Sequence, residues 1–378
     1  MVLSRLAYFL YHVLFQVKRI GTPKKIVAIS EKDALEKISQ VYPKPVSEPE
    51  VNDPVIDQSL DLSIVVPVYN YADVIRQNIE SILGQKTSYK YELILVDDGS
   101  TDGAGEILKE YAAKENVNVI FQDNMGIAGA RNTGINHATG RYLMFADCDD
   151  ILNDEIVERL LNRAYEQDCD IVMCAHDLVK EKDGQVISVL ANIYPPYNLL
   201  GFQNHDEIMN YAGLPWAKVY KRELFNNVRF LPGYWYEDTI IQFLLFSQCR
   251  HFSYIPYVGY EYKWYEKNFS HTQNNSTNVK CIDRYWMLLD IIEKYKELQL
   301  PLDAKFYTML LRHVSIYYYP QIKGLSEDLQ EALFLLAREQ IVTYRPEQGC
   351  NLPYILKVTE KALLDKDINL WKLATKYQ

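Results

Sequence analysis

Two carboxylates that directly follow an apolar run are the residues of this sequence with the clearest chemical meaning. The run YLMFA at 142–146 leads into Asp147 and Asp149, which are separated by one residue. In an extended chain, side chains two positions apart lie on the same side, so these carboxylates would repel each other unless a cation lay between them. Oxygen ligands suit Mg²⁺ or Mn²⁺ bridging a diphosphate. The spacing therefore predicts a divalent metal site, with helix capping by Asp150 as the alternative.

Polar residues also follow two earlier apolar runs. The segment VVPVYN places Pro67, Tyr69 and Asn70 at the end of the first run, and VDDGSTDG places Asp97 and Asp98 at the end of the second. A carboxylate here can accept a hydrogen bond from a base N–H while Tyr69 or Pro67 packs against the ring. Together such residues would recognise a pyrimidine nucleotide. In the alternative interpretation, Asp98 caps the helix that follows.

A glycine-rich segment with an arginine follows the third apolar run. In QDNMGIAGARNTG, Gly126 and Gly129 allow close backbone approach, and Arg131 lies just inside a predicted helix. A guanidinium there can form paired hydrogen bonds with a diphosphate. The segment has neither the Gly-Lys-Ser/Thr ending of a P-loop nor the G-x-G-x-x-G spacing of a dinucleotide turn. The two glycines alone therefore identify no phosphate-binding loop.

An alternation of strands and helices must position these residues. Apolar runs predict buried strands at 62–68, 92–96, 117–121, 142–146 and 170–174. Helical spacing occupies the intervening stretches at about 73–84, 104–114, 127–138 and 154–166. This order predicts an α/β fold, a Rossmann-like sheet with helices on both faces. Ligands bind such sheets at the carboxyl ends of the strands, where all three polar clusters fall.

Four regions are expected along the chain. Residues 1–20 form a predicted amphipathic helix, too short in its apolar part to span a bilayer, which lies either at a membrane surface or on the protein itself. Residues 21–61 combine a helical pattern with an acidic, proline-containing linker. The catalytic domain is expected over 62–275, and residues 276–378 have the apolar stripes of a helical region.

Composition excludes several classes of function. The 40 basic and 50 acidic residues give a net charge of −10, which disfavours nucleic acid as a partner. The six cysteines form no C-x-x-C pair, and reduced thiols in a cytoplasm explain them most simply. Many of the 30 tyrosines gather after residue 185, where they would line a sugar groove, fill a core or face a second copy in a homo-oligomer.

The four motifs together resemble a known family. VVPVYN, VDDGSTDG, GIAGARN and ADCDD, in this order and separated by strand–helix units, look like the family 2 inverting glycosyltransferases with the GT-A fold, the nucleotide-diphospho-sugar transferase fold. The resemblance covers residues 62–180 closely and extends more loosely to about 272. Four ordered motifs are far more specific than any one of them.

The resemblance implies roles for the residues at the strand ends. Its nucleotide-binding set comprises Pro67, Tyr69, Asn70, Asp97, Asp98, Arg131 and Asp147. Within this set Arg131 helps to hold the diphosphate of a donor that is most often linked to uridine. Asp147 and Asp149 match the metal-binding D-x-D motif, with Mn²⁺ or Mg²⁺ as cofactor.

Two later segments complete the implied site. WYEDT resembles the family's Glu-Asp motif, in which Asp238 is the catalytic base and Glu237 helps to shape the acceptor site. His271, in NFSHT, falls where some relatives carry a residue that closes over the diphosphate or touches the metal. A solvent-facing loop histidine is the alternative for His271.

These observations predict a metal-dependent inverting glycosyltransferase. It would move a hexose or N-acetylhexosamine from a nucleotide donor, expected to be UDP-linked, to a saccharide acceptor in cell-surface polysaccharide or glycoconjugate synthesis. A lipid-linked acceptor would suit a cytoplasmic protein that is peripheral at the inner face of the plasma membrane through residues 1–20. The alternatives are a nucleotidyltransferase and a non-catalytic module that binds a nucleotide sugar or glycan.

Overall fold

The computed structural model describes residues 29–46, 48–182, 185–192, 213–264 and 276–376. The chain forms two compact units. The sheet unit comprises Pro45–Thr272 and Met287–Leu300, and the helical unit comprises Met1–Lys44, Gln273–Trp286 and Pro301–Gln378. The helix before the first strand belongs to the helical unit together with the C-terminal helices.

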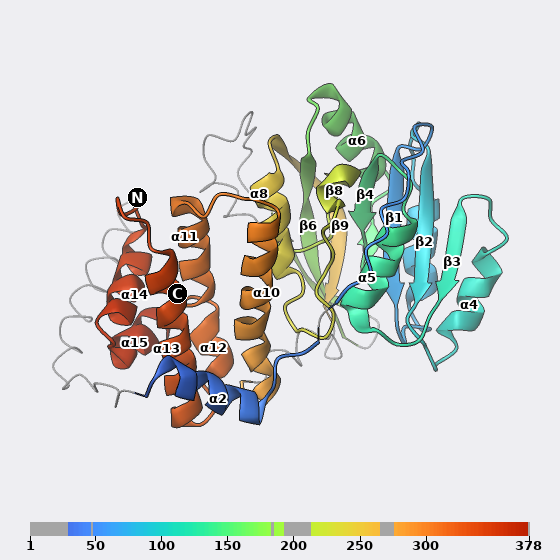
Figure 1. Cartoon of the computed structure of the whole chain (residues 1–378). Coiled ribbons are helices and arrows are strands. Elements are labelled where there is room, and N and C mark those ends of the chain that lie inside the picture. The colour runs from blue at the N-terminus through green and yellow to red at the C-terminus, as the bar shows by residue number, and fades with distance from the viewer. Residues whose placement is uncertain (1–28, 47, 183–184, 193–212, 265–275, 377–378) are drawn as a thin grey trace. The chain divides into compact units, whose positions relative to one another are not determined.

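The first half of the sheet is parallel, as its apolar runs indicate. Strands β1 (Leu62–Val68), β2 (Tyr91–Asp97), β3 (Val117–Phe121) and β4 (Tyr142–Phe145) lie side by side, with β1 between β2 and β4 (Figure 1). Val68 is paired with Asp97 at the carboxyl ends of β1 and β2. The loops that carry the first two polar motifs therefore leave the sheet next to each other.

Helices cover both faces of this sheet. The helices are α3 (Ile75–Leu83), α4 (Ala104–Tyr111), α5 (Gly126–His137) and α6 (Ile156–Glu166). Leu62, Ile64 and Val66 point to one face and share a core with residues of α3, α4 and α6. Val65 points to the other face, where a Cβ added at Gly134 of α5 would lie 2.2 Å from Val65 Cγ1. Only glycine allows α5 to approach β1 so closely, and the predicted two-sided fold is confirmed.

The second half of the sheet contains strands for which the sequence predicts no residue range. Its strands are β5 (Ile151–Leu152), β6 (Ile171–Lys182), β7 (Gln185–Asn192), β8 (Lys218–Lys221) and β9 (Phe252–Trp264), and the sheet order is β3-β2-β1-β4-β8-β6-β9-β5, with β7 on β6. The sheet is mixed because β8 runs antiparallel to β4 and β6. In the β6–β9 pair, the register moves from Ile255 directly to Val258, so Pro256 is bulged out of the ladder that it cannot join.

The region between β8 and β9 contains short helical pieces. These are a 3₁₀ turn, η1 (Arg222–Phe225), a π-helical turn, η2 (Ile241–Leu245), and α8 (Phe246–Gln248). The helical backbone begins at Thr239 and continues through η2 and α8. The apolar run TIIQFLLF is therefore helical, as its sequence predicts.

The helical unit has its own core. Its elements are α2 (Glu31–Val41), η3 (Val279–Ile282), the first turn of α10 (Asp283–Glu297), α11 (Ala304–His313), α12 (Tyr318–Ile322), α13 (Glu327–Tyr344), α14 (Tyr354–Leu364) and α15 (Ile368–Lys376). Trp371 is fully buried against Tyr318 and Phe334. The predicted C-terminal helical region is confirmed. Among the described residues, no helix is both long enough and apolar enough to cross a membrane. The helix predicted for residues 1–20 lies outside the described residues.

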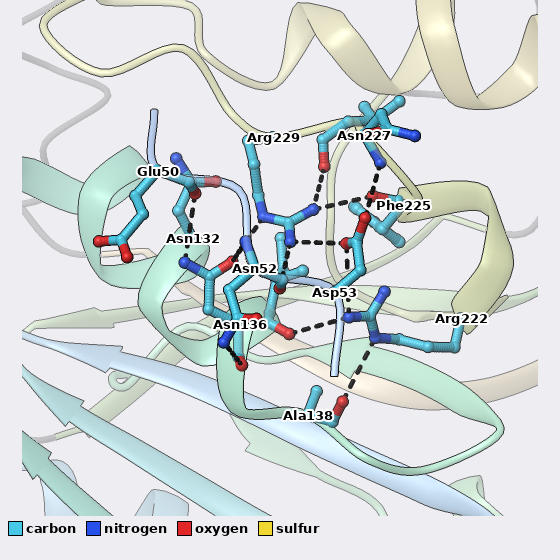
Figure 2. A network of polar contacts seen from close by, with 12 residues as sticks. Glu50, Asn52, Asp53, Asn132, Asn136, Ala138, Arg222, Phe225, Asn227 and Arg229 are labelled. Atoms are coloured by element: carbon cyan, nitrogen blue, oxygen red, sulfur yellow. Dashed lines mark hydrogen bonds and ion pairs between the residues drawn. The ribbon is translucent and has the colours of Figure 1, made fainter. Parts of the chain in front are cut away.

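Figure 2 shows how part of the acidic segment before β1 is held against the sheet unit. The guanidinium of Arg229 is the centre of this network. It donates to Asp53 Oδ1 at 2.8 Å, to the Asn52 carbonyl at 2.7 Å and to Asn136 Oδ1 of α5 at 2.8 Å. It also donates to the Phe225 carbonyl at 2.8 Å. The segment expected to be a linker is thus fixed at residues 52 and 53 to Arg229, which also binds Asn136 of α5.

A second buried arginine makes the charge of Asp53 important. Arg222 donates to the carbonyls of Ile135 and Ala138, and its Nη2 lies 3.9 Å from Asp53 Oδ1. Burial, followed by the neighbouring charge of Arg229, lowers the pKa of Arg222 to about 10. Asp53 is therefore the carboxylate that compensates two closely spaced buried cations.

Replacing Asp53 with alanine should destabilise the sheet unit by about 3 kcal/mol, because it leaves Arg229 buried without its carboxylate. This is the lower end of the range for a broken buried pair, since the Asp53 side chain is 28% exposed. Thermal and urea unfolding would measure the loss. The matched control is Glu110→Ala, which breaks an equally close ion pair with Arg76 whose side chains are 56% and 48% exposed. The control should cost at most about 1 kcal/mol, and equal losses in the two variants would contradict the role of Asp53.

Candidate active site

The polar loops that follow β1 and β2 are joined to each other by Asn70. Its backbone has a left-handed conformation, with φ of 60°, which asparagine adopts more readily than most residues. Asn70 Oδ1 accepts from Thr101 N–H at 2.8 Å, and its own N–H donates to Ser100 Oγ at 3.0 Å. Tyr69 beside it is 46% exposed, whereas Pro67 is buried inside β1. The structure thus presents Tyr69 to solvent at this edge and keeps Pro67 in the strand.

Asp97 and Asp98 are buried at the end of β2 and are held by different loops. Asp97 Oδ1 accepts from Ser100 N–H at 3.0 Å. Asp98 Oδ1 accepts from Met125 N–H at 2.8 Å and from Gln122 Nε2 at 2.7 Å. Burial raises the pKa of Asp98, and these hydrogen bonds oppose the rise. The interpretation of Asp98 as the cap of the next helix is wrong, because its carboxylate binds the loop after β3 instead.

Residues 147–150 form a turn at the end of β4. The Asp150 N–H donates to the Asp147 carbonyl at 3.1 Å, so the extended conformation expected for this segment is not found. The charges of the two predicted metal ligands still interact. Burial, followed by the charge of Asp147, raises the pKa of Asp149 to about 7. The turn therefore brings together two carboxylates whose ionised forms disfavour each other.

Three residues that the sequence did not identify hold this turn in place. Tyr260 of β9 accepts from Asp147 N–H at 3.0 Å and donates to Asp150 Oδ2 at 2.6 Å. Asn78 of α3 donates to the carbonyls of Asp147 and Asp150. The Lys263 N–H donates to Asp150 Oδ1 at 2.8 Å. Asp150 therefore does not cap α6, and its carboxylate fastens the turn to β9.

The carboxylates of Asp147 and Asp149 fit a divalent cation. Burial and mutual repulsion are costs that a bound cation would relieve, and Mg²⁺ is commonly held by one or two carboxylates together with substrate phosphates. Within the ranges that the structure describes, no group of three or more His, Cys, Asp or Glu side chains forms a metal site. His271, the third predicted ligand, lies outside those ranges. The described residues thus include two of the three predicted ligands, and the role of His271 stays a prediction.

Arg131 of α5 lies between the two acidic motifs. Its Nη2 donates to Asp147 Oδ1 and its Nη1 donates to Glu237 Oε1, each at 2.8 Å. The side chain is 2% exposed. Burial disfavours its charge, but Asp147 and Glu237 together raise the pKa of Arg131. Both terminal nitrogens are engaged by carboxylates, and the diphosphate contact expected for Arg131 stays a prediction.

The Glu-Asp motif lies at the start of the helical segment that precedes β9. Tyr236 has a left-handed backbone with φ of 57°, an unfavourable conformation for an aromatic residue. Glu237 is buried, and burial raises its pKa while the ion pair with Arg131 opposes that change. Asp238 is partly exposed and directly precedes Thr239, where the helical backbone begins. The structure therefore joins Glu237 to the D-x-D motif through Arg131 and places Asp238 at a helix N-terminus, as predicted.

The sequence is similar to those of known glycosyltransferases. Residues 63–229 match the sequence model of Glycosyl transferase family 2. Glycosyltransferase GlyG of Streptococcus pneumoniae serotype 4 is 37% identical over 201 residues, which cover 49% of this chain and 65% of GlyG. Glycosyltransferase GlyA of the same organism is 32% identical over 211 residues, 53% of this chain and 30% of GlyA. The chain thus spans less than two thirds of these two relatives.

A third relative is named for a specific transfer reaction. The poly(ribitol-phosphate) beta-N-acetylglucosaminyltransferase TarP of Staphylococcus aureus is 27% identical over 270 residues, which cover 67% of this chain and 80% of TarP. Among solved structures, S. aureus TarS 1–349 in complex with UDP-GlcNAc has a TM-score of 0.54 and 17% identity, covering 84% of this chain and 91% of that one. At such identity the likeness concerns the fold. With its family match, its curated relatives and this fold, the chain contains a family 2 glycosyltransferase domain of the GT-A type.

Proposed function

We propose that this protein is a metal-dependent inverting glycosyltransferase that uses a UDP-linked sugar. The observation that carries the proposal is the pairing of Arg131 with both Asp147 and Glu237, since Asp149 interacts with Asp147 and Asp238 follows Glu237 in sequence. One acidic pair suits a cation on the donor side, and the other suits proton transfer on the acceptor side. A nucleotidyltransferase or a non-catalytic binding module would not require both the Asp147/Asp149 pair and the Glu237/Asp238 pair.

In the proposed reaction an acceptor hydroxyl attacks the anomeric carbon in one displacement. The new bond joins the acceptor oxygen to that carbon, the bond from the carbon to the phosphate oxygen breaks, and the hydroxyl proton passes to the carboxylate of Asp238. Mg²⁺ or Mn²⁺, held by Asp147 and Asp149, would supply charge neutralisation for the departing diphosphate. The partial exposure of Asp238 supports this role, because a general base must be within reach of the acceptor hydroxyl.

The nucleotide is proposed to bind over the loops that follow β1 and β2. The exposed ring of Tyr69 is placed to pack against a base, and the buried carboxylates of Asp97 and Asp98 are the candidate acceptors of a base N–H. Asn70 would act by holding the two loops together through Ser100 and Thr101 rather than by reading the base. Support for a uridine nucleotide comes from TarS, whose solved complexes contain UDP-GlcNAc and UDP.

A donor panel tests the function. The purified protein would be incubated with UDP-, GDP- and CMP-linked sugars, Mn²⁺ and short saccharide acceptors, and the nucleotide products would be measured. Release of UDP that depends on an acceptor would support the proposal. Pyrophosphate as the product would indicate a nucleotidyltransferase, and donor binding without any release would indicate a binding module.

The acceptor is proposed to be a saccharide of a surface polysaccharide or glycoconjugate, carried on a lipid at the cytoplasmic face of the membrane. Names of relatives support this class, since TarP acts on poly(ribitol-phosphate) by its name.

A homo-oligomer formed through the tyrosine-rich C-terminal region also stays a prediction, which light scattering would test.

Removal of residues 1–20 should move the protein from the membrane fraction to the supernatant after cell lysis, because these residues carry the proposed interfacial helix. Transfer to a short, water-soluble acceptor should change by less than about twofold, since an interfacial helix binds the membrane without contributing to chemistry. Fractionation by ultracentrifugation and an assay of UDP release measure the two effects. If the truncated and full-length chains fractionate alike, the helix packs on the protein.

A further inference from the structure

Arg131 contacts two carboxylates that belong to different motifs. Each terminal nitrogen of its guanidinium holds one carboxylate, Asp147 on one side and Glu237 on the other, both at 2.8 Å. Asp147 follows β4, and Glu237 follows a loop 106 residues beyond Arg131 in the chain. One planar cation therefore connects the end of a strand to the start of a helical segment.

The surroundings of Arg131 keep its guanidinium from turning towards other partners. Its Cζ lies 5.3 Å from the centre of the Phe230 ring. The neighbouring Asn132 forms two hydrogen bonds with the backbone of Phe230, donating to its carbonyl and accepting from its N–H, each at 2.8 Å. Phe230 itself follows Arg229, the centre of the network in Figure 2. The guanidinium is thus fixed by stacking from Phe230 and by the clamp between α5 and residue 230.

Asp147 and Glu237, the two carboxylates that Arg131 holds, differ in how far their side chains are exposed. Arg131 occupies Asp147 Oδ1, and the Asp147 side chain is 23% exposed. The contact fixes the rotamer of Asp147 and so the direction in which Oδ2 points. The side chain of Glu237 is 10% exposed and lies beside the more exposed Asp238. The orientation of each motif therefore depends on the same guanidinium.

We infer that Arg131 is a positioning residue that couples the metal side of the site to the acceptor side, by orienting Asp147 for a divalent cation and Glu237 for the acceptor. The inference rests on the proposed function for its acceptor side. A guanidinium can bind both carboxylates at once because it is planar and holds its N–H donors in a fixed geometry, whereas a lysine ammonium is a compact point charge. Charge alone would not perform this coupling.

Arg131→Lys tests the inference because it keeps the charge and removes the fork. The variant should bind Mn²⁺ about 10- to 100-fold more weakly than the wild type, the scale for losing a residue that orients a metal ligand. Binding would be measured by electron paramagnetic resonance of free Mn²⁺, with no donor or acceptor present. The Michaelis constant for the acceptor should also rise.

Arg222→Lys is the matched control for general damage to the core. Arg222 is also 1% exposed in the sheet unit, but its hydrogen bonds go to backbone carbonyls of α5 and of the residue that follows it. Loss of melting temperature in the two variants should be similar, while Mn²⁺ affinity should fall only in Arg131→Lys. Equal Mn²⁺ affinity in the two variants and the wild type would overturn the inference.

Glu237→Gln provides a second test if Arg131→Lys does not fold. Glu237 makes no contact with the proposed cation in this assignment, yet removing its charge weakens the hold on Nη1 of Arg131, so the guanidinium orients Asp147 less firmly. Mn²⁺ affinity should therefore fall several-fold at a distance, and an affinity within about twofold of the wild type would contradict the coupling. Because Mn²⁺ binding is measured without substrates, a wild type that releases no UDP would refute the proposed function and leave this test intact.

Discussion

Asp238→Asn should lower turnover by roughly 10²- to 10⁴-fold, the usual range for losing a general base. Asp238 directly precedes Thr239, where the helical backbone begins, so a role as the cap of that helix is the alternative to a role as base. Asparagine caps a helix as well as aspartate does but accepts no proton at neutral pH. The substitution therefore removes the proposed chemistry and keeps the proposed structural role. Turnover by UDP release and binding of donor by calorimetry would be compared in the wild type and the variant.

The expected pattern is an unchanged melting temperature, unchanged donor affinity and a large loss of turnover. Glu237→Gln should reduce turnover less, because the role assigned to Glu237 is orientation of the acceptor. If Asp238→Asn kept more than about a tenth of wild-type turnover, a loss smaller than the lower end of that range, the base would lie elsewhere. Glu237, which is buried beside it, would then be the first candidate.

The parts of the fold that the sequence predicts best are those with local periodic signals. β1 and β3 lie at the predicted residues, and the predicted helices α3, α4, α5 and α6 are present. In this region each strand is a mainly apolar run followed by a helix with buried apolar residues. Beyond residue 180 the signal fails, because β9 alternates apolar with polar residues and includes Pro256 in a bulge. A strand with such a pattern can be identified only when the strand that it pairs with is known.

The site shows the same division between local and distant information. The order of the acidic residues along the chain identifies the two motifs, because each follows a single strand or precedes a single helix. The contacts that position them join residues far apart in sequence, such as Tyr260 with Asp147 across 113 residues and Arg131 with Glu237 across 106. A single sequence, considered by itself, contains no signal for such pairs of distant residues.

The segment before β1 illustrates how composition misleads. Its prolines and acidic residues are typical of a solvated linker, and most of its charges are exposed. Asp53 differs from the other acidic residues of the segment because it pairs with Arg229 and lies near Arg222, two buried arginines 176 and 169 positions further along. Nothing within the segment distinguishes Asp53 from its neighbours, so only the fold reveals its role.

Asp149→Ala should abolish metal-dependent donor binding while leaving the fold intact. The wild type is expected to gain thermal stability from UDP only when Mn²⁺ is present, since a ligand at about 100 times its Kd stabilises a protein by about 2.7 kcal/mol. In the variant this gain should disappear. Transfer by the wild type should cease in excess EDTA and return with added Mn²⁺, and full activity in EDTA would rule out the metal assignment.

The stability of the metal-free variant separates a metal ligand from a structural carboxylate. Asp149 is partly buried beside the like charge of Asp147, so its removal relieves repulsion and should not lower the melting temperature of the metal-free protein. Asp150→Ala should behave differently, because it strips the hydrogen bonds that Asp150 accepts from Tyr260 and from the Lys263 backbone and costs about 1–3 kcal/mol or more. Asp154→Ala, which removes an exposed partner of Lys86, is the neutral control. A metal-free Asp149→Ala protein as unstable as Asp150→Ala would mean that Asp149 holds the turn together, and its role as a ligand would have to be abandoned.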